Sequence, residues 1–333
     1  MKYRSDVIGL GLESSCDETS ASITLNGERI LSNIIFSQIE LHREYYGVVP
    51  EIASRAHLEV INDMIKEALH EAGVDFKDID YVAATNRPGL VGSLLIALQS
   101  AKAISYTLQI PLIAINHLEA HLYAPFLENR KIFFPFIGLV ISGGNTIIYR
   151  VNGLGELQVI GKTVDDAIGE SYDKVAKYLK LGYPGGPIIE KTAKQAKNRK
   201  MIFPKILTKK QDEFRFSYSG IKTAVINYVK KNPEADFSEI AYSFQERALE
   251  LIIRRIFPAA RLHNIKDIVI TGGVASNGRL REMLRENARE DENIIIPSPI
   301  LCTDNAAMVA GLGYHYFQKK IFSDLSVDVS SRV

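Results

Sequence analysis

The stretch DVIGLGLESSCDETSASITLNGERILSNIIFS, residues 6–37, decides how this chain begins its fold. It contains three apolar runs, VIGLGLE, SASITL and ILSNIIF, which are separated by polar turns at residues 15–18 and 26–27. Short apolar runs bounded by turn residues are typical of neighbouring strands in one sheet. The stretch therefore predicts a three-stranded meander.

Helices and strands alternate after the meander. A helical pattern opens at Pro50 and stops at Gly73, and both residue types are favoured at those ends of a helix. The strand DYVAAT, a helix from Leu90 to about Leu108 and the strand LIAIN follow. The first part of the chain thus has the predicted order β-β-β-α-β-α-β.

A similar order returns in the second part of the chain. The segments FIGLVIS, TIIYRV and ELQVIG are predicted to be three strands, and further helices and strands follow them. Two halves of similar order predict a duplicated α/β fold with a cleft between its lobes. We expect an N-terminal lobe at residues 1–130, on which a last helix at about 305–333 packs back, and a C-terminal lobe at residues 131–304. Residues 187–237 do not fit the repeat and are interpreted as an irregular insertion.

Composition limits the class of protein. The 333 residues, of which 46% are hydrophobic, suffice for two ordinary domains. Forty Lys plus Arg against 39 Asp plus Glu give a net charge of +1, so contact with nucleic acid must come from a local basic patch. Two cysteines are too few for a disulfide scaffold, and the first residues lack a signal-peptide pattern. Because polar residues interrupt the apolar stretch 89–115, we expect a soluble, cytoplasmic protein without a membrane span.

The segment HLEAH places His117 and His121 four residues apart. On a helix this spacing puts both imidazoles on one face, where they either bind one metal ion or are simply solvated or hydrogen-bonded. A zincin protease needs glutamate directly after the first histidine, and that position is Leu118. Two histidines are an incomplete ligand set. The third candidate ligand is Asp304, in the segment CTDN at a predicted strand-to-helix junction.

Two glycine-rich turns follow predicted strands, VISGGN at residues 140–145 and GGVASN at residues 272–277. Glycine lets backbone amides approach a phosphate or ribose, and a following helix N-terminus favours an anion. Most such turns are ordinary, but two in corresponding places, joined by YPGGP at 183–187, favour a nucleotide cleft. Neither turn is a P-loop or a dinucleotide fingerprint.

The turn ESSCDET, residues 13–19, carries three acids that are either solvated or directed at the cleft. In the second case Asp17 and Glu18 are candidates for orienting a substrate or a phosphate-bound metal. No local signature pairs Cys16 with a base, so we interpret it as structural.

The insertion is locally basic. Cations in such a run usually form a solvated helix face, but in a near-neutral protein they also make a polyanion site plausible, with RNA as one partner. The cations, with no acid between them, are Lys191, Lys194, Lys197, Arg199, Lys200, Lys205, Lys209 and Lys210.

Taken together, these motifs resemble the TsaD, Kae and Qri threonylcarbamoyltransferases, formerly called O-sialoglycoprotein endopeptidases. The resemblance runs from about Ile8 to Ala310. It implies an actin-like, Hsp70-like ATPase fold of two lobes with a nucleotide cleft between them. The motifs that carry it, in order, are ESSCDET, YYGVVPEIASRAH, HLEAH, VISGGN, DDAIGESYDKVAKYLKLGYPGGP, FSYSGIKT, GGVASNGRLR and CTDNAAM.

The resemblance also implies a reaction. The threonylcarbamoyl group would pass from threonylcarbamoyl-adenylate to N6 of adenosine 37 in tRNAs that read ANN codons, which forms t6A and releases AMP. By similarity His117, His121 and Asp304 bind one divalent metal, Fe²⁺ in preference to Zn²⁺, and Asp17 and Glu18 match acids near the reacting group. The positions that correspond to binding of ATP or the adenylate are Val140, Ile141, Ser142, Gly143, Gly144, Asp173, Gly186, Glu190 and Asn277.

The implied partners are tRNA and a separate synthase that supplies the adenylate. In bacteria a paralogous actin-like subunit and a small P-loop ATPase are also implied. This sequence departs from the usual family pattern without losing a predicted metal ligand, which leaves a bacterial or an archaeal-like branch open. The departures are Asn145, Asn86-Arg87, Ala275-Ser276 and Ala306.

Other functions remain open. A small-molecule kinase of the same fold would hold Mg²⁺ mainly through phosphates and carboxylates, which the histidine pair disfavours. A metalloprotease is disfavoured by Leu118. A non-catalytic scaffold in a larger complex would be favoured by loss of the metal ligands, and all three candidates are present.

Overall fold

The computed structural model describes residues 6–206 and 214–332, and the chain forms two compact units. The first unit comprises Met1–Lys131 and Thr303–Val333, and the second comprises Ile132–Cys302.

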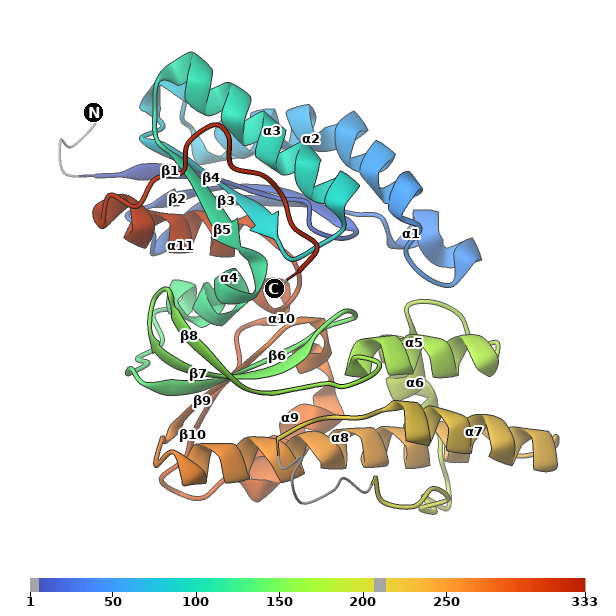
Figure 1. Ribbon diagram of the computed structural model, residues 1–333. Coiled ribbons are helices and arrows are strands. Elements are labelled where there is room, and N and C mark those ends of the chain that lie inside the picture. The colour runs from blue at the N-terminus through green and yellow to red at the C-terminus, as the bar shows by residue number, and fades with distance from the viewer. Residues whose placement is uncertain (1–5, 207–213, 333) are drawn as a thin grey trace. The chain divides into compact units, whose positions relative to one another are not determined.

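The sheet of the first unit has the strand order β3-β2-β1-β4-β5 (Figure 1). The first three strands pair antiparallel, whereas β4 and β5 run parallel to β1. The predicted meander is therefore confirmed. The strands are β1 (Ile8–Glu13), β2 (Glu18–Leu25), β3 (Arg29–Ser37), β4 (Tyr81–Arg87) and β5 (Leu112–Asn116).

Helices cover both faces of this sheet, with α2 and α3 on one face and α11 on the other (Figure 1). Helix α2 ends where Gly73 adopts a left-handed φ of 66°, as its sequence predicts. Among the described residues, α3 is long and apolar enough to span a bilayer, but it packs on β4 and α2 as a core helix does. The helices are α1 (Ile39–His42), η1 (Arg43–Tyr45), α2 (Pro50–Ala72), η2 (Phe76–Asp78), α3 (Val91–Leu108), α4 (His117–Tyr123), η3 (Ala124–Glu128) and α11 (Ala306–Gln318).

The start of α11 lies unusually close to the central strand β1. A Cβ atom on Gly11 would come within 2.3 Å of the carbonyl oxygen of Ala306, so only glycine permits this approach. The Ala306 amide also donates a hydrogen bond of 2.9 Å to Ser20 Oγ on β2. These contacts fix the position of the residues just before α11, which include Asp304.

The second unit repeats the topology of the first. Its sheet has the order β10-β9-β6-β7-β8, in which β6 to β8 are antiparallel and β9 and β10 are parallel to β6. The predicted duplication is therefore confirmed. The strands are β6 (Phe136–Ile141), β7 (Thr146–Gly153), β8 (Glu156–Lys162), β9 (Asp267–Thr271) and β10 (Asn293–Ile295).

The segment interpreted as irregular contains packed helices instead. Most of α6 and all of α7 lie within residues 187–237, and Ile189 and Val225 from these helices are fully buried in the core of the unit. Lys209 and Lys210 lie outside the described residues. The helices of the unit are α5 (Ile168–Tyr178), α6 (Gly185–Ala193), α7 (Ser219–Lys231), α8 (Phe237–Leu262), η5 (Gly273–Ser276), α9 (Gly278–Asn287) and α10 (Pro299–Cys302).

Candidate metal centre and nucleotide-binding loops

The first unit brings His117, His121 and Asp304 together. Their ligand atoms all lie within 4.8 Å of one another. The Asp304 Oδ1 atom lies 3.0 Å from His121 Nε2 and 3.6 Å from His117 Nε2. Two imidazole nitrogens and one carboxylate oxygen thus converge on one point.

Helix α4 positions the two histidines. It begins directly after β5, and the Asn116 side chain caps it by accepting hydrogen bonds from the amides of Leu118 and Glu119. Both rings are buried, and their centroids lie 4.6 Å apart at an interplanar angle of 80°. Glu119 turns away from them and accepts a hydrogen bond of 2.8 Å from the Tyr316 hydroxyl on α11, which ties the two helices together.

Glu13, at the end of β1, is a site residue that the sequence analysis did not identify. It is fully buried, and its Oε2 atom lies 3.0 Å from His117 Nδ1. The hydroxyl of Thr85 donates to the same oxygen at 2.6 Å, and the Ser15 amide donates to Oε1 at 2.6 Å. A carboxylate on Nδ1 holds a proton there, so Nε2 is the His117 nitrogen that can bind a metal ion once its own proton has left.

Opposite charges dominate the electrostatics of this centre. Burial disfavours the charged form of His117, but the carboxylates of Glu13 and Asp304 outweigh burial and raise its pKa to about 9. Burial likewise opposes ionisation of Asp304, but the two histidines lower its pKa to about 2. Burial and the charge of His117 lower the pKa of His121.

The donor set fits a divalent metal ion. Imidazole nitrogens combined with a carboxylate suit Zn²⁺ and Fe²⁺, and three protein ligands leave positions open for substrate or water. Glu13 supplies the outer carboxylate that usually orients a metal-binding histidine. His121 Nε2 faces Asp304 Oδ1 at 3.0 Å, whereas its Nδ1 is buried without a hydrogen-bond partner among the described residues.

Replacing Glu13 by glutamine should lower the metal affinity of the protein about 10- to 100-fold, because His117 loses its charged orienting partner. Titration of the metal-free protein with Zn²⁺ or Fe²⁺ in competition with a chelator measures this affinity. Glu51→Gln, an exposed acid in the first turn of α2, is the matched control. Equal affinities for Glu13→Gln and the control would contradict the role of Glu13.

Asp17 lies in the loop between β1 and β2, and Glu18 is the first residue of β2. Burial and the nearby charge of Asp17 raise the pKa of Glu18 well above its ordinary value. Burial raises the pKa of both, and the negative charge of Asp304 raises both further. Burial also raises the pKa of the Cys16 thiol well above its usual range, which fits a structural Cys16 rather than a nucleophile.

The second unit brings its glycine-rich turns together. After β6, the Ser142 amide donates to the Asn145 carbonyl at 2.8 Å and closes a tight turn. Gly272, with φ 92°, passes so close to Ile141 that a Cβ atom would lie 2.3 Å from the Ile141 carbonyl oxygen. The two turns therefore lie side by side.

Other residues of this unit that were predicted to bind the nucleotide mostly make hydrogen bonds to main-chain amides at the starts of helices. Asn277 caps α9, and Glu190 Oε1 on α6 accepts a hydrogen bond of 3.2 Å from the Gly278 amide. Asp173 Oδ1 accepts a hydrogen bond of 2.7 Å from the Gly185 amide at the start of α6. The side chains of Val140 and Ile141 are fully buried, so a ligand can meet only their main chain.

Packing does not require glycine at three positions, two in the VISGGN turn and one at the start of α6. A Cβ atom on Gly143, Gly144 or Gly186 would meet no atom within 4 Å. In contrast, a Cβ atom on Gly169 or Gly185 would clash with neighbouring backbone atoms. The first three glycines thus leave open space beside the turns, as a cradle for a ligand requires.

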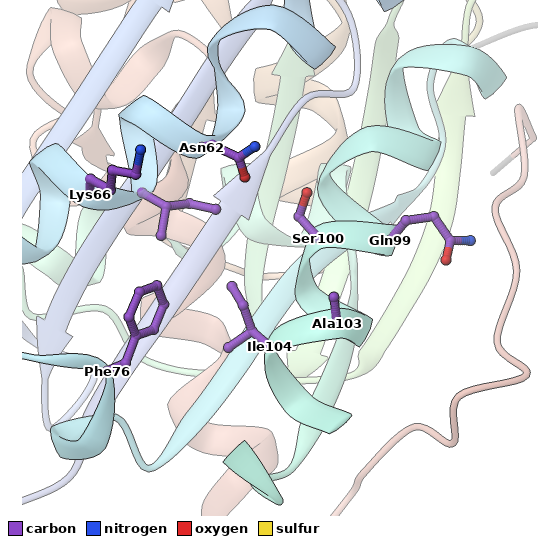
Figure 2. A pocket seen from close by; sticks show the side chains of 8 residues that line it. Asn62, Lys66, Phe76, Gln99, Ser100, Ala103 and Ile104 are labelled. Atoms are coloured by element: carbon purple, nitrogen blue, oxygen red, sulfur yellow. The ribbon is translucent and has the colours of Figure 1, made fainter. Parts of the chain in front are cut away.

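A separate groove lies between α2 and α3 in the first unit (Figure 2). It has a volume of about 530 Å³ and contains none of the predicted site residues. No acid or histidine lines it. Its lining residues are Asn62, Ile65, Lys66, Phe76, Gln99, Ser100, Ala103 and Ile104.

Comparison with known proteins shows the family to which this chain belongs. The family model described as TsaD, tRNA N6-adenosine threonylcarbamoyltransferase, matches residues 29–311. Two proteins with that name, from Treponema denticola and Syntrophus aciditrophicus, are 48% and 45% identical to this chain. The matches cover 97% and 98% of this chain and 96% and 97% of the relatives.

Solved structures with low sequence identity share the fold alone. Full-length HypF in its phosphate- and nucleotide-bound form is 14% identical, with a TM-score of 0.63 over 96% of this chain and 57% of that chain. The activator of 2-hydroxyisocaproyl-CoA dehydratase from Clostridium difficile, with bound ADPNP, is 15% identical, with a TM-score of 0.55 over 96% of this chain and all of that chain. The predicted two-lobe α/β fold is confirmed.

Proposed function

Because this chain belongs to the tRNA N6-adenosine threonylcarbamoyltransferase (TsaD) family, we propose that its first unit binds a divalent metal through His117, His121 and Asp304 and its second unit holds the adenylate. The protein is a tRNA-modifying transferase that forms t6A. Relatives that bear this name over nearly the whole chain favour this function over the kinase and scaffold alternatives.

The observation that carries the proposal is that three candidate ligand atoms lie within 4.8 Å of one another. Buried Glu13 contacts Nδ1 of His117, the ring nitrogen on the side away from Asp304. The threonylcarbamoyl-adenylate is a mixed anhydride and already activated. The protein therefore has to position the adenine amine and stabilise charge that develops at the carbonyl oxygen. A bound metal ion supplies Lewis-acid stabilisation of negative charge on oxygen. We propose Fe²⁺ as this ion, with Zn²⁺ as the alternative.

Asp17 and Glu18 have the chemistry to move the proton. N6 forms a bond to the carbonyl carbon, the bond from that carbon to the phosphate oxygen breaks, AMP departs, and the amine gives up one proton. We assign that proton to the carboxyl groups of Asp17 and Glu18, whose pKa values are raised by burial. Both side chains are half-buried, so they lie partly within the first unit rather than fully on its surface.

The main chain of residues 140–144 and the space beside Gly186 suit a nucleotide. Backbone amides at glycine-rich turns bind phosphate and ribose without side-chain interference. Two proteins of the same fold, HypF and the dehydratase activator, have nucleotide ligands in their solved structures. We infer that these turns hold the adenylate or ATP in this chain.

Exposed cations of the second unit suit the tRNA. Lys197, Arg199 and Lys200 are exposed in one short segment, where phosphate contacts would make binding depend on salt. We further propose a cytoplasmic location, a synthase that supplies the adenylate, and partnership with a paralogous actin-like subunit and a small P-loop ATPase.

Gly186→Val should raise the KM for threonylcarbamoyl-adenylate more than about tenfold, because the added side chain fills the open space of the cradle. The measurement is nucleoside mass spectrometry of t6A in an ANN-decoding tRNA, with purified protein, synthetic adenylate and the accessory proteins. Gly220→Val is the matched control, since Gly220 is also the second residue of a helix with no atom near its Cβ position. Equal KM values for the two variants would contradict the cradle, and absence of t6A with the unaltered protein would contradict the function.

A further inference from the structure

We propose that His57, on α2, is a positioning residue for the transfer reaction and holds the loop of Asp17 and Glu18 through a hydrogen bond to the main chain of Cys16. The inference rests on the proposed role of these two acids. His57 is fully buried, and its Nε2 atom lies 3.0 Å from the Cys16 carbonyl oxygen.

Three successive carbonyl groups of the loop each accept a hydrogen bond from a different part of the first unit. The Leu90 amide donates to Ser15 at 2.8 Å, and the Gln38 amide donates to Asp17 at 2.9 Å. The bond to Cys16 between them comes from the His57 side chain. The Ser93 hydroxyl lies 3.5 Å from the same oxygen, so His57 is the closer donor.

The surroundings of His57 fix its tautomer. A carbonyl oxygen only accepts, so the bond to Cys16 requires a proton on Nε2. Nδ1 must then accept, and it faces the hydroxyl of Thr19 at 2.7 Å and the side-chain nitrogen of Gln38 at 3.2 Å. Burial lowers the pKa of His57, which favours the same neutral form.

Neighbouring groups orient Gln38 for this contact. Its side-chain nitrogen lies 3.4 Å from the Ala53 carbonyl oxygen, and its side-chain oxygen lies 3.3 Å from His42 Nε2. The Gln38 amide hydrogens therefore face Ala53 and His57. Gln38 thus contacts the loop directly through its main chain and indirectly through His57.

This arrangement links α2 to the acids without any contact between His57 and the metal ligands in the described hydrogen bonds. If His57 no longer donates, the Cys16 carbonyl loses its closer partner and the adjacent Asp17 can shift. A misplacement of about 1 Å at a reacting group can cost about 100-fold in rate. The expected defect is therefore in kcat, whereas metal binding and the KM for tRNA stay unchanged.

Two conservative replacements distinguish the roles of the two ring nitrogens of His57. Glutamine places an N–H donor where His57 has Nε2, and asparagine places an acceptor where His57 has Nδ1 but has no donor that reaches Cys16. We expect His57→Asn to lower kcat about 10- to 100-fold with unchanged metal content, and His57→Gln to keep kcat within about threefold. Equal kcat for the two variants, or a loss that simply follows their melting temperatures, would overturn the inference.

A second measurement does not depend on the folding of a variant. Nitrogen-15 NMR of the histidine rings in the unaltered protein distinguishes the two tautomers. A proton on Nε2 of His57 supports the inference, and a proton on Nδ1 overturns it. Failure of the unaltered protein to form t6A would contradict the proposed function instead, so the two failures are distinguishable.

Discussion

We expect joint replacement of His117 and His121 by alanine to abolish both metal binding and t6A formation. The two rings supply two of the three converging ligand atoms, and Asp304 alone cannot hold a divalent ion. Metal content is measured by plasma mass spectrometry of the purified proteins, and t6A by nucleoside mass spectrometry with the adenylate and tRNA supplied. The expected readings for the variant are the background levels of both assays.

The control replaces His70 and His263, which lie outside the centre, by alanine and should keep metal and activity. Added metal should also raise the melting temperature of the unaltered protein but not that of the His117, His121 variant, since a ligand stabilises only the state that binds it. If the variant forms t6A without bound metal, the protein still catalyses the transfer, but the metal has no role in it.

The second large effect is expected at the acid pair. Asp17→Asn and Glu18→Gln together should lower kcat about 100-fold or more, because they remove the proposed proton acceptor while they keep side-chain size. Metal content should not change. The measurement is the rate of t6A formation at saturating adenylate and tRNA.

Asp63→Asn with Glu67→Gln, two exposed acids of α2, provides the matched control for the loss of charge. If the Asp17, Glu18 variant turns over like this control, proton transfer does not depend on the pair.

The fold was predictable because its signals are local. Strand alternation, turn residues and the stop at Gly73 each act over a few residues, and the meander and its repeat followed from them. The helices α6 and α7 were not predicted because the basic run between them, which starts at Lys194, dominates the composition of the segment. Their buried positions, such as Ile189 and Val225, become visible only when a core is present to receive them.

The candidate site was predictable only where its residues are neighbours in sequence. Helical spacing brings His117 and His121 together, whereas Glu13 reaches His117 because β1 pairs with β4 and β4 pairs with β5. The sequence places Glu13 at the end of a predicted strand and Asp17 in the turn, but which of them meets His117 depends on those pairings. His57 is separated from Cys16 by 41 residues, so its contact likewise depends on tertiary structure.

The central strand β1 also determines when the metal centre is assembled. Gly11 admits the start of α11 on one side of the strand, and Glu13 ends the strand against His117. Both contacts are made by one strand whose backbone is held by hydrogen bonds to β2 and β4, so the spacing between Gly11 and Glu13 is fixed by the strand. The entropy of arranging the ligands is therefore lost once, when the chain folds, and each catalytic cycle begins with a centre that is already in place.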